Sequence, residues 1–160
     1  MALVVEDGSI VTGANSYVSV AFANDYMSAR EFSSPGNDAT MEALLLQAMD
    51  FLNGIDDWIG NRVDASVQEL DWPRTGVPLV EQTSIPKLLQ NAQVELVRAI
   101  EEGIDVFPNR QAGEFVTEER VGPIQVRYSP FIGTDSTPTM GYIDRVLSRY
   151  RSPRFVTERA

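Results

Sequence analysis

Residues 38–53 read DATMEALLLQAMDFLN, and this stretch decides the fold class. Its apolar side chains recur at the i, i+3, i+4 and i+7 spacing of a helix that turns one face toward a core. They are Met41, Leu44, Leu45, Ala48 and Leu52. Asp38 stands where an N-cap is wanted, and Asn53-Gly54 tolerates the left-handed conformation that often ends a helix. The spacing therefore predicts a buried helix over residues 39–53.

Three more helices are expected on either side of this one. Ser19 is a candidate N-cap for a helix over residues 19–30. Pro86 suits the first position of a helix over residues 86–102, because its missing N–H has no partner to lose there. A last helix is expected over residues 139–150. Apolar positions at helical spacing in each stretch indicate a common core.

The remaining stretches predict strands and loops. Residues 115–121 and 124–128 alternate with a period of two, which predicts a β-hairpin. Residues 54–84 show no helical period but are rich in Trp and Pro, which favours an ordered, packed loop. The fold class expected is mostly α: a small bundle of about four helices with a β-hairpin and long ordered loops. Residues 1–150 form one domain, and residues 151–160 form an extended C-terminal arm.

Composition excludes most catalytic chemistry. The 160 residues include no His, no Cys and a single lysine, Lys87, so His-based triads, thiolate nucleophiles and Cys/His zinc sites are absent. The acidic pairs are neighbours in sequence, whose side chains usually diverge rather than converge on a metal. They are Asp56-Asp57, Glu101-Glu102 and Glu118-Glu119. A hydrolase built from carboxylates alone has little support. We expect no enzyme, no cofactor and no metal, and the short aliphatic runs predict no membrane partner.

Charge is distributed unevenly along the chain. The net charge is −10; residues 1–144 carry 8 basic and 22 acidic side chains, whereas residues 145–160 carry five arginines and one acid. An acidic body opposes binding to phosphates, because nucleic-acid affinity depends on cations that displace counterions. A basic end suits an acidic protein surface. The balance therefore favours a body that repels DNA and an arm that docks on a protein.

The arm supplies the first group of candidate binding residues. Arginines surround Ser152-Pro153, and two apolar residues follow as possible anchors. These candidates are Arg149, Arg151, Arg154, Phe155 and Val156. The arm either orders on a partner, steered by its arginines, or is a solvated terminus.

A loop motif and the hairpin supply the second group. Trp72-Pro73-Arg74 can anchor the loop on the core or contact another subunit. Arg120 and Arg127 lie in the predicted hairpin. A base-stacking platform built on the tryptophans is less favoured, since neighbouring acids such as Asp71 would repel phosphates.

Five short blocks of sequence occur in a fixed order and together span roughly residues 2–128. They are residues 2–8 with 14–19, residues 51–62, residues 72–77, residues 85–96 and residues 119–126. In this order the blocks give the chain a resemblance to a tailed-bacteriophage family. The chain is similar to head–tail connector, or adaptor, proteins, and the same family carries the label DnaT-like single-stranded-DNA-binding protein.

The adaptor resemblance implies a structural virion protein at the head–tail interface, made in the host cytoplasm. It implies a ring of twelve copies beneath the portal that extends the DNA channel toward the tail. Its partners are then the portal protein, a tail-side protein and further copies, with double-stranded DNA only as passing cargo. The arm residues become portal-docking residues, and Trp72, Arg74, Arg120 and Arg127 become subunit or tail contacts.

The alternative is a replication accessory protein that binds single-stranded DNA. The two descriptions differ in the sign of charge that they require at the DNA. The acidic body favours an adaptor whose wall does not hold the duplex, and the structural virion protein is therefore the expected function.

Overall fold

The computed structural model describes residues 2–107, 118–121, 124–127 and 140–152. The chain divides into two compact units, one made of residues 1–104 with 140–160 and one made of residues 105–139. The first unit holds four α-helices and a short 3₁₀ helix among its described residues. They are α1 (Val20–Ser28), α2 (Asp38–Asn53), α3 (Lys87–Glu101), α4 (Gly141–Leu147) and η1 (Ser148–Tyr150). The mostly α fold is confirmed, whereas the domain boundary at residue 150 stays a prediction.

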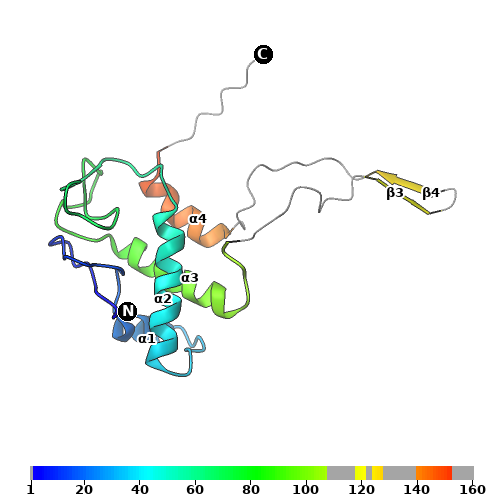
Figure 1. Cartoon of the computed structure of the whole chain (residues 1–160), viewed down its shortest axis with the longest axis horizontal. Helices are drawn as coiled ribbons and strands as arrows, with labels where there is room; N and C mark the ends of the chain where they lie inside the picture. The colour runs from blue at the N-terminus through cyan, green and yellow to red at the C-terminus, as the bar shows by residue number, and fades with distance from the viewer. Residues whose placement is uncertain (1, 108–117, 122–123, 128–139, 153–160) are drawn as a thin grey trace, which may run out of the picture. The chain divides into compact units, whose positions relative to one another are not determined.

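Helix α3 is the centre of the first unit. Helices α1, α2 and α4 all pack against it, and Figure 1 shows α2 crossing α3. Apolar residues from all four helices are buried in the core, including Met27, Leu45, Leu52, Leu89, Leu96 and Leu147. Burial of several such side chains, each contributing about 1.5–3 kcal/mol, holds the helices together. The apolar spacing seen in residues 38–53 therefore marks a true core face.

Helix α1 begins where the sequence predicts. The Ser19 Oγ accepts a hydrogen bond of 3.1 Å from the Phe22 N–H, which satisfies one of the unpaired donors of the first turn. Helix α3 begins one residue later than expected, because Pro86 is the N-cap rather than the first helical residue.

Helix α2 ends at Asn53 as predicted, but its N-cap and the conformation at its C-terminal end differ from expectation. Asn37, not Asp38, is its N-cap, and the Asn37 Oδ1 accepts from the Thr40 N–H at 2.9 Å. Asp38 instead lies in the first turn, where a negative charge interacts favourably with the helix dipole. At the other end Gly54 has a right-handed conformation, with φ of −75°, so the left-handed stop predicted there is wrong.

The loop over residues 54–84 is ordered and packed, as predicted. Two segments within the loop are joined by a short antiparallel ladder between β1 (Asn61–Arg62) and β2 (Arg74–Thr75). Gly60 precedes β1 with a φ of +75°, and a Cβ there would collide with the Thr75 carbonyl. Glycine is therefore required where these two segments approach each other.

Buried polar side chains connect the N-terminal segment to the helices. On α3, the Gln93 side chain accepts from the Tyr17 N–H at 3.0 Å and donates to Ser16 Oγ and to the Leu45 carbonyl. The Glu6 carboxylate, also buried, accepts from three backbone N–H groups nearby. Buried polar groups are stable only when paired in this way.

The second unit contains the predicted hairpin. Strands β3 (Glu118–Val121) and β4 (Ile124–Arg127) pair antiparallel, with Glu118 opposite Arg127 and Arg120 opposite Gln125. Residues 115–117 and 128, which the sequence also assigned to the strands, lie outside the described residues.

Across the part of the chain that the structure describes, no helix is long and apolar enough to cross a membrane.

Candidate nucleic-acid interface

Trp72 is an internal anchor. Its side chain is fully buried and makes edge-to-face contacts with Trp58, at 5.9 Å between ring centroids, and with Tyr150, at 5.4 Å. Such aromatic pairs add stability beyond their buried area. The ring therefore joins the 54–84 loop to η1 and is not presented on the surface of the subunit.

The Arg74 side chain also makes its contacts inside the loop. Its Nε donates to the Ile59 carbonyl at 2.9 Å, and its Nη2 donates to the Gly60 carbonyl at 2.6 Å. The Asp71 carboxylate lies 3.7 Å from Nη1. Burial lowers the pKa of Arg74, and these acceptors hold its charge in place. Arg74, which lies in β2, therefore ties the two strands together by hydrogen-bonding to the residues just before β1.

The start of the predicted arm is held by its own subunit. Arg151 forms a two-point ion pair with Asp57, and the backbone of Tyr150 and Ser152 hydrogen-bonds to residues 57 and 59. The hydrogen bond to Asp57 raises the pKa of Arg151. Three predicted docking residues, Arg154, Phe155 and Val156, lie outside the described residues.

The outer face of α4 and η1 brings an aromatic ring and two cations together. Tyr142, Arg145 and Arg149 are all exposed, with Tyr142 at 53%. Tyr142 and Arg145, three residues apart on α4, lie about 60° from each other around its axis, and Arg149 follows in η1. We call these three residues the basic–aromatic stripe. Arg149 was predicted as a contact residue, whereas Tyr142 and Arg145 were missed, although their i, i+3 and i+7 spacing was readable.

Packing explains why the stripe faces outward. Ile143, Val146 and Leu147 are buried and hold the opposite face of α4 on the core. The nearest acid in sequence, Asp144, lies on the other flank of the helix at this periodicity. A local cationic surface therefore exists on a subunit that is acidic overall.

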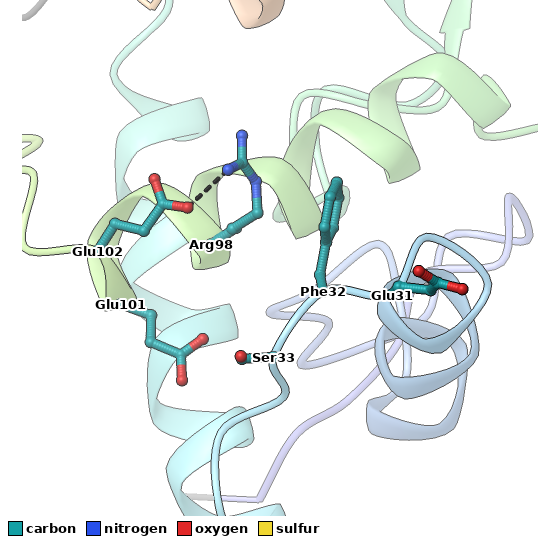
Figure 2. Close-up of a pocket in the computed structure, with 6 residues that line it drawn as sticks. All are labelled: Glu31, Phe32, Ser33, Arg98, Glu101 and Glu102. Carbon is teal, nitrogen blue, oxygen red and sulfur yellow. Dashed lines mark hydrogen bonds and ion pairs between the residues drawn. The ribbon is translucent and has the colours of Figure 1, made fainter.

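A second exposed feature has the opposite charge. A cavity of about 370 Å³ lies beside the ends of α1 and α3, and Figure 2 shows its lining residues. They are Glu31, Phe32, Ser33, Arg98, Glu101 and Glu102. The one arginine is already paired, with Glu95 at 3.0 Å and Glu102 at 2.6 Å. Three glutamates around the cavity repel phosphates, so it is unsuited to a nucleic acid.

The hairpin places two arginine positions on one face. Because Glu118 pairs with Arg127 and Arg120 pairs with Gln125, these four positions share one side of the ladder. The predicted arginine sites Arg120 and Arg127 are therefore diagonal positions on the same side of the ladder. Among the described residues, no group of three or more Asp or Glu side chains is arranged to hold a metal ion.

Comparison with known proteins gives one match. The family described as "Putative DnaT-like ssDNA binding protein" matches residues 1–159. The chain belongs to this family. No curated protein and no solved structure matches the chain. The family description is that of a binding protein and indicates no enzymatic domain.

Membership of the DnaT-like family corrects the expected partners. A portal protein and a tail-side protein, with double-stranded DNA only as passing cargo, are wrong, because the match points to single-stranded DNA. Ring assembly and a place in the virion find no support in the comparisons. The expected partners rested on the summed charge of the body, which does not show where each charge lies. A DNA strand meets one surface, and the basic–aromatic stripe is cationic although the whole chain is not.

Proposed function

We propose that this protein binds single-stranded DNA as a non-enzymatic accessory protein, with the basic–aromatic stripe as its contact surface. The observation that carries the proposal is the family match over residues 1–159. The stripe is the described surface whose chemistry fits such a ligand. Arg145 and Arg149 supply charge for two phosphates, and Tyr142 supplies a ring on which an unpaired base stacks.

The stripe favours a single strand over a duplex. Stacking on Tyr142 needs the exposed face of a base, which a duplex hides within its stack. Two arginines, one on α4 and one on η1, reach few phosphates, whereas duplex binders without base contacts rely on many. Preference for the single strand therefore follows from the pairing of one ring with two cations.

The acidic remainder of the protein limits the affinity. With a net charge of −10, the protein repels a polyanion over about one Debye length, and that length increases from about 8 Å at 0.15 M salt to about 30 Å at 0.01 M. Two phosphate contacts on a single strand predict a slope of log K against log salt of about −1.4 from the stripe. Binding is therefore expected to be modest and sensitive to salt.

Fluorescence anisotropy with labelled oligothymidine, across a salt series, tests the proposal. Arg145→Gln is compared with Lys87→Gln, because each removes one positive charge and Lys87 is exposed at the start of α3. We expect Arg145→Gln to weaken binding and to reduce the slope by about 0.7, and Lys87→Gln to do neither. A wild-type protein that does not bind at low salt contradicts the function. Equal losses in both variants contradict the stripe.

A further inference from the structure

We propose that Tyr150 is a positioning residue of the DNA-binding surface: it fixes η1 on the 54–84 loop and thereby sets the place of Arg149. The inference rests on the proposed function and adds to the site a residue that acts through its neighbour. Tyr150 directly follows Arg149 in η1, and its side chain is half-buried. Such a role has a measurable consequence, because the effect of Tyr150 on binding disappears once Arg149 is removed.

The short helix η1 needs support from outside itself. It spans only Ser148–Tyr150, has no fully buried residue, and is followed at Arg151 by extended backbone. Helices of this type have poor hydrogen-bond geometry, and a helix end without tertiary contacts frays. Helix α4, in contrast, is held on the core by its own buried side chains. The position of Arg149 therefore depends on what holds η1.

The 54–84 loop supplies this support through Tyr150. The Tyr150 ring meets the fully buried Trp72 ring edge-to-face, with 5.4 Å between the ring centroids. The Tyr150 carbonyl accepts a hydrogen bond of 2.8 Å from the Ile59 N–H. Trp72 is in turn packed against Trp58, which is also buried. Figure 1 shows the end of α4 beside this loop. Tyr150 therefore rests on side chains of the core.

Fixing η1 in advance favours binding at Arg149. A long side chain on a loose segment loses freedom when it contacts a phosphate, and this loss weakens binding. The ion pair between Arg151 and Asp57 holds the chain one residue further on. Removal of the Tyr150 ring contact should therefore loosen η1 without releasing it, and the expected loss of affinity is partial.

A double-mutant cycle with oligothymidine tests this role. Tyr150→Leu removes the ring contact, Tyr150→Phe keeps it, and Arg149→Gln removes the charge. We expect Tyr150→Leu to weaken binding about two- to tenfold and Tyr150→Phe to bind like the wild type. Combined with Arg149→Gln, Tyr150→Leu should cause no further loss. Glu6→Gln, which removes a buried carboxylate from the N-terminal segment, should leave binding unchanged and is the control for lowered stability.

Hydrogen exchange on the wild-type protein gives a second readout that needs no variant to fold. The Ile59 N–H exchanges when its hydrogen bond to the Tyr150 carbonyl opens. If oligothymidine binds best when η1 is held on the loop, it stabilises that form by mass action. Saturating oligothymidine should therefore slow exchange at Ile59 about two- to tenfold, and an unchanged rate overturns the inference.

The outcomes separate this inference from the proposed function. If Arg145→Gln weakens binding while Tyr150→Leu binds like the wild type, Tyr150 has no positioning role and the stripe stands. If the losses from Tyr150→Leu and Arg149→Gln add, Tyr150 acts independently of Arg149 and the inference is wrong. If the wild-type protein does not bind, both are wrong.

Discussion

Arg151 and Asp57 form a two-point ion pair, with 2.6 Å between Nε and Oδ1 and 3.0 Å between Nη2 and Oδ2. The pair joins residues 94 positions apart and secures the end of η1, which carries Arg149. Neighbouring backbone hydrogen bonds run from Ile59 N–H to the Tyr150 carbonyl and from Ser152 N–H to the Asp57 carbonyl. One end of the basic–aromatic stripe is therefore positioned by the 54–84 loop.

Asp57→Asn should lower the free energy of unfolding by about 1–2 kcal/mol. The partners are only 26% and 15% exposed, so the loss should fall between those typical of surface pairs and of buried pairs. Urea denaturation measures it. Glu102→Gln breaks the Arg98–Glu102 contact, whose carboxylate is 54% exposed, and should cost less than about 0.5 kcal/mol. Equal losses in the two variants would show that the Arg151 pair has no special role.

Glu6→Gln should destabilise the N-terminal segment by about 1–3 kcal/mol. The buried carboxylate accepts from the N–H groups of Gly8, Ile10 and Val11 at 2.8, 3.0 and 2.8 Å. An amide replaces one acceptor oxygen with a donor, which leaves at least one buried N–H unpaired. Thermal unfolding checks the loss. Asp7→Asn, at an exposed neighbour, is the control, and a Glu6→Gln variant no less stable than it would refute the role of Glu6.

Gln93→Leu should cost about 2–4 kcal/mol. The similar volume of leucine leaves the packing of α3 intact but strips hydrogen bonds from Tyr17 N–H, Ser16 Oγ and the Leu45 carbonyl. Gln47→Leu, on the exposed side of α2, is the matched substitution and should change stability by less than about 0.5 kcal/mol. Urea midpoints that coincide for the two variants would contradict the network.

Leu79→Asn should raise the free energy of unfolding by about 0.5–1 kcal/mol. Leu79 has a φ of +61° in the turn closed by the Val80 N–H to Val77 carbonyl hydrogen bond, and its side chain is fully exposed. Asparagine tolerates the left-handed conformation better than leucine, and no buried contact is lost. Val67→Asn, also exposed but without a positive φ, should give no gain. A destabilised Leu79→Asn protein would contradict the strain argument.

Tyr142→Ala should weaken binding of oligothymidine about five- to a hundredfold, whereas Tyr142→Phe should bind nearly as well as the wild type. Stacking uses the ring face, which phenylalanine keeps, and contributes about 1–3 kcal/mol per base. Tyr142 is exposed, so neither substitution should change the melting temperature by much. Loss of affinity in Tyr142→Phe would instead indicate that the hydroxyl makes the contact.

The helices were predictable because their signals are local. The apolar period in residues 38–53, the Ser19 cap and the hairpin register all depend on backbone geometry within a few residues. The misplaced cap at Asp38 shows the limit of such signals. Asn37 and Asp38 are both good capping residues. Asn37 is the N-cap because its backbone is extended, whereas the backbone of Asp38 is already helical.

The candidate site was only partly predictable. Arg149 was identified from the arm's charge, but the same reasoning included Arg151, which the fold pairs with Asp57. For Trp72 and Arg74 the sequence favoured an anchor of the loop and left a subunit contact open, and both side chains are buried within the loop. Summed charge favoured a body that avoids DNA, because a sum over the chain carries no information on where each charge lies.

The amino-acid sequence by itself determined the helical elements, the hairpin and the lack of His and Cys chemistry, since these depend on residue type and on spacing along the chain. Only the tertiary structure decided which arginines are exposed on the surface and which are paired within the protein. Packing on α3 turns Arg145 and Arg149 outward beside Tyr142 and brings α1 to the same helix, while Asp57 takes Arg151. Contacts between distant residues depend on how the helices pack, and the local sequence pattern does not encode that packing.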